Sequence, residues 1–402
     1  MVRFIFTIIG LMISLDLVWW IVFARLTNHG VARVLVSIFM IVMMLGLIGV
    51  IAARMSRSGW ERFIPKFAVT AIVIWHSIGL GLLSLIALAL IPILLGQKIV
   101  RIARHVPSPI TRSVEAPAWS RREFLRFAGA MLPPAFTFSL TGIAMAQLNN
   151  VRIRRFVLPI PELPKQLDGT TIAQVSDMHV GRFTNGDVLK KVVRMVNEMR
   201  ADLVLLTGDL INDALADLDT GLELTRAMEA RFGLAIIEGN HDLIENPTEF
   251  EARVKASGIP FLLDESTVIT VRGVPVQLLG LSWTRIYGKG RDAAIATSVQ
   301  RLLEQRVADA FPILMAHHPH AFDAAASAGL PLTLSGHTHG GQLMLNEQLG
   351  FGPALFRYWS GLYERGQSKL IVSNGVGNWF PLRLNAPAEI LHLTLRTADA
   401  SG

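Results

Sequence analysis

Cysteine is absent from the 402 residues of this sequence. Its absence excludes disulfide bonds, a catalytic thiolate and cysteine-ligated zinc. A chain without cysteine fits a reducing compartment, and it equally fits an exported domain that needs no covalent cross-links. Any metal site in this chain must therefore use carboxylate, amide or imidazole ligands.

Negative charge is scarce in the first 150 residues, where four Asp or Glu stand against fourteen Lys or Arg, a net charge of +10. The whole chain carries +7, from 38 basic and 31 acidic residues, so residues 151–402 carry −3. The basic balance thus belongs to the N-terminal part of the chain. Because its basic residues flank long apolar runs, we do not expect nucleic-acid binding.

Long apolar runs fill most of residues 1–96, and we predict three transmembrane helices there. Two of the runs have about the 20 residues needed to cross a bilayer, and the third is longer and can tilt. Asp16 interrupts the first run and His76 interrupts the third. Ionisable residues within a span suggest a function, but a packed polar group at a helix interface is the simpler interpretation of both. The three runs are 4–23, 34–53 and 67–95.

Residues 97–119 form a basic connector that contains proline, and residues 120–147 combine a charged motif with a fourth apolar run. The run ends in Ala144-Met145-Ala146, which resembles a leader-peptidase site. The motif resembles the twin-arginine export signal, except that Arg126 stands where that pattern has lysine. Its sequence is Ser120-Arg121-Arg122-Glu123-Phe124-Leu125-Arg126.

The orientation of these helices depends on how that motif is interpreted. As an export signal it makes the twin-arginine machinery a partner, and it places the C-terminal part on the outer face of a bacterial inner membrane. The alternative is an ordinary fourth span with a basic flank and a C-terminal part in the cytoplasm. Counts of basic residues on the two sides do not decide between them. We favour the export interpretation for this multi-pass protein.

From residue 151 to residue 402 the pattern is that of a soluble α/β domain. Apolar residues at helical spacing predict helices, and short apolar runs predict strands, two of which form a hairpin around Arg272-Gly273. Strands that alternate with helices and then pair with one another suggest a core of two mixed sheets with helices outside. The expected helices are 187–200, 222–232, 249–257 and 294–304, and the hairpin strands are 267–271 and 274–281.

In this domain, Asp, His or Asn residues follow each of five short apolar runs. These residue types are ligands of divalent metals. Chance placement of such residues after all five predicted strands is improbable. The sequence therefore predicts a metal site made from strand ends. The polar residues, in chain order, are Asp177 and His179, then Asp209, then Asn240, His241 and Asp242, then His317, and finally His337 and His339.

With these motifs, about residues 168–396 resemble the calcineurin-like metallophosphoesterases. The run from Ser335 to Gln342 and the tail segments around Gly361, Asn374 and Arg383 resemble a membrane-linked bacterial branch typified by twin-arginine-exported phosphodiesterases. The resemblance implies a four-layer αββα sandwich with a two-metal site at its strand ends. Where Asn374 stands, that branch usually has arginine, so the resemblance implies no phosphate contact at this position.

The resemblance also implies a role for each motif residue. Asp209 would bridge two metal ions, His241 would be the general acid or a donor to the transition state, and Asp242 would orient His241. The ligands of the first metal would be Asp177, His179 and His339, and those of the second would be Asn240, His317 and His337.

Elementary chemistry agrees with this implication. Two cations neutralise a phosphate ester and lower the pKa of a bridging water, so that a bridging hydroxide forms near neutral pH. Mixed imidazole and carboxylate ligands suit Mn, Zn, Fe or Co better than Ca. Guanidinium groups bind phosphate through two hydrogen bonds, so Arg182 and Arg383 are candidate substrate-binding residues, with Arg285 and Arg291 as weaker ones.

We therefore expect a membrane-anchored, metal-dependent phosphoesterase, and more narrowly a phosphodiesterase that acts on a membrane- or wall-associated phosphate ester. One alternative is a pyrophosphohydrolase or phosphatase acting on lipid-linked substrates such as lipid A precursors. The other is a membrane sensor whose metal domain binds a ligand without hydrolysing it, which only Asp16 and His76 would support.

Overall fold

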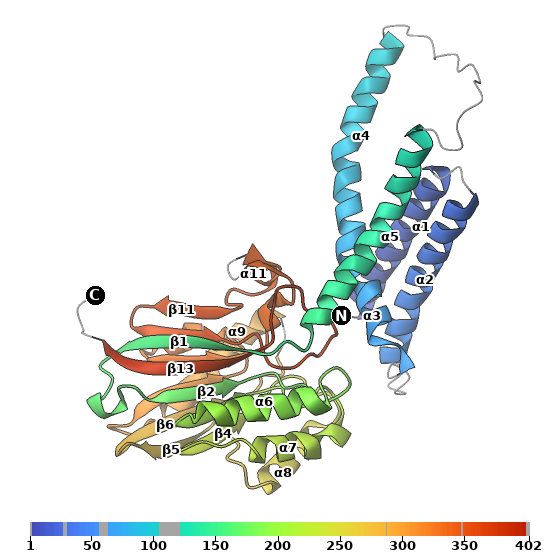
Figure 1. The fold of residues 1–402 in the computed structure, drawn as a ribbon. Coiled ribbons are helices and arrows are strands. Elements are labelled where there is room, and N and C mark those ends of the chain that lie inside the picture. Colours follow the sequence, from blue (N-terminus) through green and yellow to red (C-terminus); the bar gives the residue numbers. More distant parts are fainter. Residues whose placement is uncertain are drawn as a thin grey trace. The chain divides into compact units, whose positions relative to one another are not determined.

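The structure, a computed structural model, describes residues 2–26, 30–55, 63–103, 121–286, 288–346 and 349–398 (Figure 1). The chain divides into two compact units, Met1–Met145 and Ala146–Gly402. The division falls at the end of the segment 120–147 that the sequence analysis separates from the soluble domain. Each unit is described by itself below.

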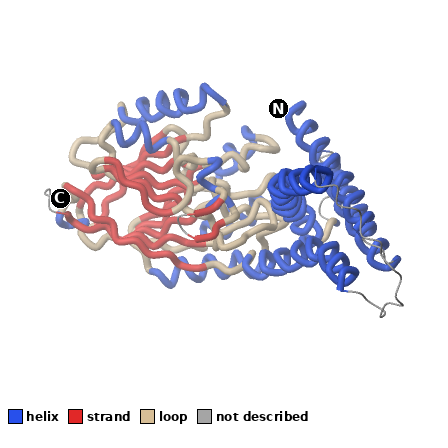
Figure 2. Tube along the Cα trace, turned by 90° about the horizontal axis from the view of Figure 1, so that it is seen from above, coloured by secondary structure: helices blue, strands red, loops and turns tan. Residues whose placement is uncertain are grey.

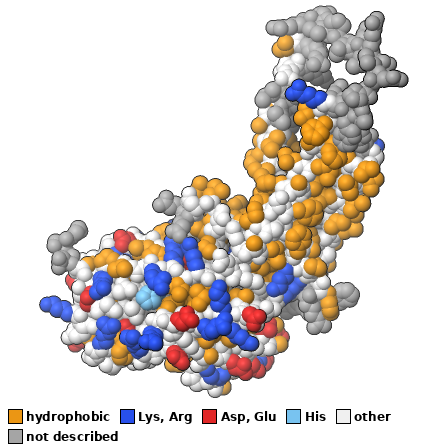
Figure 3. Space-filling view, in the orientation of Figure 1, with side chains coloured by type: hydrophobic (Ala, Val, Ile, Leu, Met, Phe, Trp, Pro, Cys, Tyr) orange, Lys and Arg blue, Asp and Glu red, His pale blue; other side chains and the backbone are white. Residues whose placement is uncertain are grey.

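The first unit is helical, and apolar side chains cover much of the surface that Figure 3 shows for it. Among its described residues, four helical segments are long and apolar enough to cross a membrane, and they lie where the sequence predicts the three spans and the fourth apolar run. These segments are Phe6–Arg25, Gly30–Ala53, Lys66–Ala89 and Glu123–Gln147. The helices are α1 (Val2–Leu26), α2 (Gly30–Met55), α3 (Lys66–Ile74), α4 (Leu80–Ala103) and α5 (Arg121–Gln147), and a π-helical turn (Trp75–Gly79) joins α3 to α4.

One boundary in this unit differs from the prediction. The expected connector begins at residue 97, but α4 continues to Ala103. No glycine or proline follows Gly96 until after Ala103, so nothing in this stretch ends the helix. The remainder of the connector and Ser120 of the export-like motif lie outside the described residues.

The two ionisable residues of the apolar runs meet inside the first unit. Asp16 is fully buried and accepts a hydrogen bond from Trp75 Nε1 at 2.7 Å. Its other oxygen lies 3.0 Å from His76 Nε2. His76 Nδ1 lies 2.6 Å from the carbonyl oxygen of Ile72, and because a carbonyl only accepts, Nδ1 carries a proton. Every polar atom of the pair thus has a partner, which favours the structural interpretation of both residues.

Two mixed β-sheets form the centre of the second unit. Within each sheet the strands that precede the predicted ligands run parallel to one another. The first sheet has the order β1 (Arg152–Pro161), β13 (Glu389–Ala398), β2 (Thr171–Val175), β3 (Leu203–Thr207) and β4 (Gly233–Ile237). The second has the order β11 (Gly361–Arg365), β12 (Ser368–Val372), β8 (Leu332–Ser335), β7 (Phe311–Ala316), β6 (Val274–Leu281) and β5 (Glu265–Val271).

Helices cover the outer face of each sheet, so the expected four-layer αββα sandwich is confirmed (Figures 1 and 2). One large apolar cluster, with residues from both sheets, fills the space between them. The first sheet is covered by α6 (Gly186–Met199), α7 (Leu218–Arg226) and α8 (Pro247–Ala256), and the second by α9 (Arg291–Leu303) and α10 (Ala321–Ser327). Shorter elements are β9 (Met344–Asn346), β10 (Leu349–Gly350) and α11 (Gly352–Leu355).

The predicted helices and the hairpin are present, with one clear shift. The sequence predicts a helix at 222–232, whereas α7 begins at Leu218 and ends at Arg226. The chain after Arg226 returns to the sheet, where the amide of Phe232 donates to the carbonyl of Asp202 just before β3. A backbone hydrogen bond to a neighbouring segment therefore outweighs the local apolar spacing.

The site is positioned by the direction of the strands. β2, β3 and β4 are parallel, and so are β6, β7 and β8, and their carboxyl ends carry the polar motifs. In α/β proteins ligands bind at the carboxyl ends of parallel strands. The side chain of Gln174 joins the two sheets near this edge, donating to Ser335 O at 2.9 Å.

Candidate metal centre

Two groups of potential metal ligands lie side by side at the carboxyl edge of the sheets. Asp177, His179 and His339 form the first group. Asp209, His317 and His337 form the second, and within each group the ligand atoms lie within 4.8 Å of one another. These groups contain six of the seven ligands that the sequence predicts, divided between the same two sets. Asn240, the seventh, contributes an amide oxygen and is considered below.

Asp209 lies between the two groups. Its Oδ2 atom is 3.1 Å from His317 Nε2 in the second group and 3.6 Å from His179 Nε2 in the first. In the first group, His339 Nε2 is 3.2 Å from Asp177 Oδ1 and 3.0 Å from His179 Nε2. The carboxylate of Asp209 can therefore serve both groups at once, as a bridging ligand must.

The backbone at these residues adopts a conformation that non-glycine residues rarely adopt. A left-handed φ at such a residue costs about 1–3 kcal/mol, and it persists only where the surrounding structure holds it. Here backbone hydrogen bonds between neighbouring strand ends hold it, from Asp177 N to Gly208 O and from His179 N to Asp209 O. Five of the seven predicted ligands share this strain, with φ of 54° at Asp177, 43° at His179, 55° at Asp209, 74° at His337 and 50° at His339.

Two glycines allow the ligand loops to come together. A β-carbon at Gly336 would overlap Ser176 Oγ and Asp177 Oδ2, and a β-carbon at Gly239 would overlap Asp209 Oδ1. Neither loop could approach the opposite carboxylate with a larger residue at these positions. The glycines of the Ser335–Gln342 and Gly239–Asp242 motifs are therefore part of the construction of the site.

The electrostatic environment prepares most of these groups for a cation. Burial raises the pKa of Asp177, but the neighbouring His339 and His317 outweigh it and bring the pKa to about 2. Burial, together with neighbouring histidines, holds the pKa of His179 and of His337 well below the usual range. The carboxylate is thus ionised and these imidazoles are neutral, which are the forms that bind metals.

His317 differs from the other histidines in its charge. Burial lowers its pKa, but the adjacent carboxylate of Asp209 outweighs burial and raises the pKa to about 9. Its Nδ1 atom lies 2.7 Å from the carbonyl oxygen of Thr207, so Nδ1 carries a proton and Nε2 faces Asp209. A cation that binds here must displace the proton on Nε2.

Asn240 completes the donor set. Its Oδ1 atom is buried and has no hydrogen-bond partner among the described residues. A buried acceptor without a partner costs about 1–3 kcal/mol, and a metal ion would satisfy it. Imidazole, carboxylate and amide donors together fit Mn, Zn, Fe or Co, as the sequence predicts.

In the structure His241 faces the site, while Asp242 makes other contacts than the predicted one. His241 lies with His179 and Asp209 in a third group of potential ligands, and its Nδ1 atom is 2.6 Å from the carbonyl oxygen of Asn212. That carbonyl fixes a proton on Nδ1 and leaves Nε2 for chemistry. Asn212 therefore orients His241, and nothing in the sequence pattern marks a backbone carbonyl for this role.

Asp242 instead supports the loops. Its two oxygens accept hydrogen bonds from the backbone amides of Ile211, at 2.9 Å, and Gly239, at 2.8 Å. These amides lie beside Asp209 and Asn240. Asp242 thus connects the loop that follows β3 to the loop that follows β4, and the expectation that it orients His241 is wrong.

Arg383 also has a different role from the predicted one. It is fully buried, and its guanidinium donates to the carbonyls of Asn374, Gly375, Gly377 and Ala386 and to Asn378 Oδ1. Its Nη2 atom lies 3.3 Å from His339 Nδ1. With its donors engaged in this way, Arg383 does not bind phosphate; it supports the loop behind His339.

Arg182 is half-buried, with its guanidinium 4.8 Å from the ring centre of Phe183, and its predicted role stays a prediction.

Aromatic rings surround the second group, and the sequence analysis missed them. The ring centre of Trp283 lies 5.0 Å from that of His337 and 5.6 Å from that of His317. His318, which the sequence analysis leaves without a role, is buried 5.1 Å from His337. A signal for Trp283 does exist, because it follows β6 just as the ligands follow the other strands.

Comparison with known proteins gives the class. Residues 170–341 match the family model of the calcineurin-like phosphoesterases. The second unit therefore contains a calcineurin-like phosphoesterase domain, which belongs to a family of hydrolases.

Relatives with this domain include membrane proteins. The chain is 30% identical over 255 residues to a transmembrane protein with metallophosphoesterase domain from Danio rerio, covering 60% of this chain and 56% of that protein. It is 28% identical over 294 residues to the uncharacterized metallophosphoesterase YkuE of Bacillus subtilis, covering 70% of this chain and 99% of that one. An uncharacterized metallophosphoesterase of Helicobacter pylori is 28% identical over 251 residues, covering 61% and 64%. The chain thus spans little more than half of the Danio rerio protein.

The corrected role of Arg383 gives a first prediction. Arg383→Lys keeps the charge but cannot reach the same set of carbonyls, so we expect a lower melting temperature and metal affinity weakened about 10- to 100-fold. Thermal unfolding and metal titration measure these effects. Arg301→Lys, a control on the exposed face of α9, should change neither. A raised KM for Arg383→Lys with unchanged stability and metal affinity would contradict the supporting role.

Proposed function

We propose that this protein is a membrane-anchored phosphodiesterase with a dinuclear metal site. The observation that carries the proposal is the carboxylate of Asp209 between two complete ligand groups. In this assignment two ions would share the carboxylate of Asp209. Asp177, His179 and His339 would hold the first ion, and Asn240, His317 and His337 would hold the second. When bound, two such cations neutralise the phosphate and activate water for in-line attack.

Residues of this chain supply the proton for the leaving group and the space for the second organic group of a diester. His241, whose Nδ1–H group donates to Asn212 O, protonates the departing alkoxide from Nε2 in its doubly protonated form and becomes neutral in this step. A cavity of about 310 Å³ opens beside Asn240, and a diester, unlike a monoester, needs such space for its second organic group. Arg182 is the proposed contact to a phosphate oxygen.

The first test compares a diester with a monoester. Purified full-length protein loaded with Mn or Zn should hydrolyse bis(p-nitrophenyl) phosphate faster than p-nitrophenyl phosphate. Asp209→Asn should lower kcat more than about a hundredfold, because an amide is a poor bridge between two cations. Asp219→Asn, on a side chain that is 77% exposed and paired only at the surface, should have no effect.

Other outcomes of this test distinguish the alternatives. Faster monoester hydrolysis would indicate a phosphatase. Tight metal binding without turnover of either compound would favour the binding module. An Asp209→Asn variant with normal turnover would contradict the assignment of the bridging ligand.

A second test isolates the proton from His241. His241→Ala should lower kcat by about 10²- to 10⁴-fold for a diester with an alkyl leaving group. The same variant should lose much less with p-nitrophenolate, because this weaker base leaves without a proton. The ratio of the two losses is measured on one enzyme preparation. Equal losses with both leaving groups would show that His241 stabilises charge rather than donating a proton.

We further propose that the four apolar helices place the protein in a bacterial inner membrane, with the phosphoesterase domain exported through the twin-arginine machinery. The seven-residue motif beginning at Ser120 and the four candidate spans support this. The substrate would then be a phosphate ester of the membrane or the cell wall.

A reporter fused after Gly402 tests the topology. β-Lactamase in this position should make intact cells resistant to ampicillin, because it protects the cell only from the outer side. Arg121→Lys combined with Arg122→Lys should abolish this resistance if the motif is recognised for export. A fusion that leaves intact cells sensitive, yet hydrolyses ampicillin in cell lysates, would place the domain inside the cell.

A further inference from the structure

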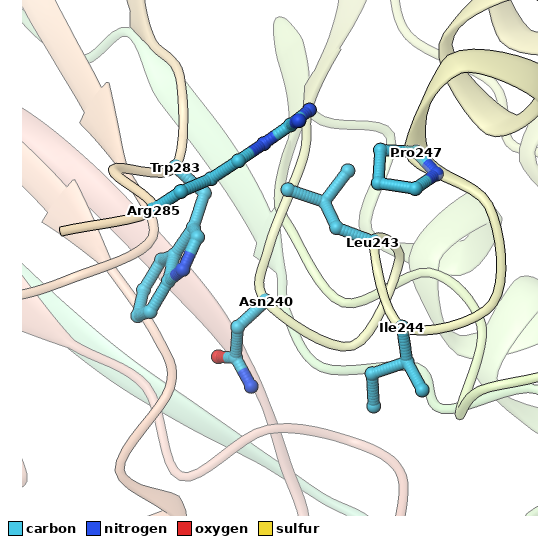
Figure 4. Close-up of a pocket in the computed structure, with 6 residues that line it drawn as sticks. All are labelled: Asn240, Leu243, Ile244, Pro247, Trp283 and Arg285. Carbon is cyan, nitrogen blue, oxygen red and sulfur yellow. The ribbon is translucent and has the colours of Figure 1, made fainter. Parts of the chain in front are cut away.

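The cavity beside Asn240 lies between the loops of the two sheets (Figure 4). One side is formed by the loop that follows β4 and by the start of α8, and the other by the segment that follows β6. Because Asn240 is both a proposed metal ligand and part of the lining, the cavity begins at the metal site. The lining residues are Asn240, Leu243, Ile244, Pro247, Trp283 and Arg285.

The wall on the β4 side is aliphatic. Leu243, Ile244 and Pro247 present no side-chain donor or acceptor to the cavity, and they lie together on the right in Figure 4. Ile244 is 42% exposed. An apolar wall next to a metal ligand attracts an apolar group, because each methylene removed from water contributes a favourable transfer free energy.

The opposite wall is a tryptophan held in place by hydrogen bonding and packing. The backbone amide of Trp283 donates to Glu238 Oε1 at 2.9 Å, and the ring packs against His337 and His317. Trp283 is only 8% exposed, yet its Nε1 atom has no hydrogen-bond partner within the described part of the chain. In Figure 4 this nitrogen lies on the side of the ring nearer Asn240, whose Oδ1 atom is also without a partner.

The polar groups of the lining thus occupy its two ends. The unpartnered atoms of Trp283 and Asn240 lie at the metal end. In Figure 4 the guanidinium of Arg285 lies away from the amide of Asn240; this side chain is mostly exposed and 3.2 Å from the carboxylate of Glu251. Between the ends, the indole ring and three aliphatic side chains face the cavity. This distribution suits a ligand with one polar end at the metals and an apolar body.

We propose that this cavity binds an aliphatic ester group of the phosphodiester, while Trp283 Nε1 donates to a phosphoryl oxygen. The substrate class is therefore a phosphodiester of an alkyl or acyl-bearing alcohol. A nucleoside is a poorer match, because the aliphatic wall has no groups to pair with the edge of a base. This inference rests on the proposed phosphodiesterase function and specifies its substrate.

The test uses p-nitrophenyl alkyl phosphates with methyl, butyl and hexyl groups, which share one leaving group. The full-length protein is reconstituted in nanodiscs so that detergent does not compete for the cavity. We expect kcat/KM to rise about fourfold per methylene until the cavity is filled, since a buried methylene contributes about 0.8 kcal/mol.

Two variants separate the apolar wall from the N–H donor. Ile244→Ser should lower kcat/KM for the hexyl ester about tenfold and leave the methyl ester unchanged. Val307→Ser is the matched control, because Val307 is 44% exposed and precedes β7 at the opposite edge of the sheet. Trp283→Phe keeps an aromatic ring without the N–H group, so it should lower kcat/KM of all three esters by a common factor of about ten with unchanged metal affinity.

The outcomes distinguish a failure of the aliphatic subsite from a failure of the proposed phosphodiesterase function. Hydrolysis of all esters at rates independent of chain length would overturn the aliphatic subsite and leave the phosphodiesterase intact. Faster hydrolysis of the p-nitrophenyl ester of thymidine 5′-phosphate than of the hexyl ester would also overturn it, in favour of a base-binding cavity. No hydrolysis of any ester by metal-loaded protein would contradict the proposed function itself.

Discussion

The position of one carboxylate, that of Asp209, determines much of the structure around it. It has to lie within reach of histidines that follow strands of both sheets, and its Oδ1 atom accepts a hydrogen bond from the backbone amide of His241 at 2.8 Å. The close approach of Gly239, the left-handed backbone at Asp209 and the hydrogen bonds of Asp242 all act on the same two loops. The left-handed backbone at Asp209 thus costs conformational free energy, and the surrounding contacts hold its carboxylate between the imidazoles.

The same constraint explains why the site needs two sheets. β2, β3 and β4 supply Asp177, Asp209 and Asn240 from one sheet, and β7 and β8 supply the remaining histidines, apart from His179, from the other. The apolar core between the sheets fixes their separation, and Gln174 ties the edges together. A change in sheet packing would therefore move the ligands of one sheet relative to those of the other within each set, which couples core stability to the chemistry of the site.

Sequence reasoning predicted the ligands because each follows an apolar run, a one-dimensional signal with a direct physical cause. It failed where a role depends on partners far away in the chain. From the sequence, Arg383 cannot be told apart from an arginine that binds phosphate. Only its burial among backbone carbonyls shows that it supports the loop instead. Asp242 is next to His241 in sequence but binds the amide of Ile211. Trp283 also follows the end of a strand, β6. It was missed because only residue types that bind metals were sought at the strand ends.

The buried polar groups of the helical unit and those of the metal site differ in their hydrogen bonding. Asp16 and His76, buried in the helical unit, find partners in each other, in Trp75 and in the Ile72 carbonyl. A network that is satisfied internally gains nothing from a ligand and stabilises the packing of the helices that carry it. Asn240 Oδ1 and Trp283 Nε1 are also buried, but the described residues provide them with no partner. Because such atoms are costly unless something binds them, the Oδ1 atom of Asn240 suits a cation and the Nε1 atom of Trp283 suits a hydrogen-bond acceptor.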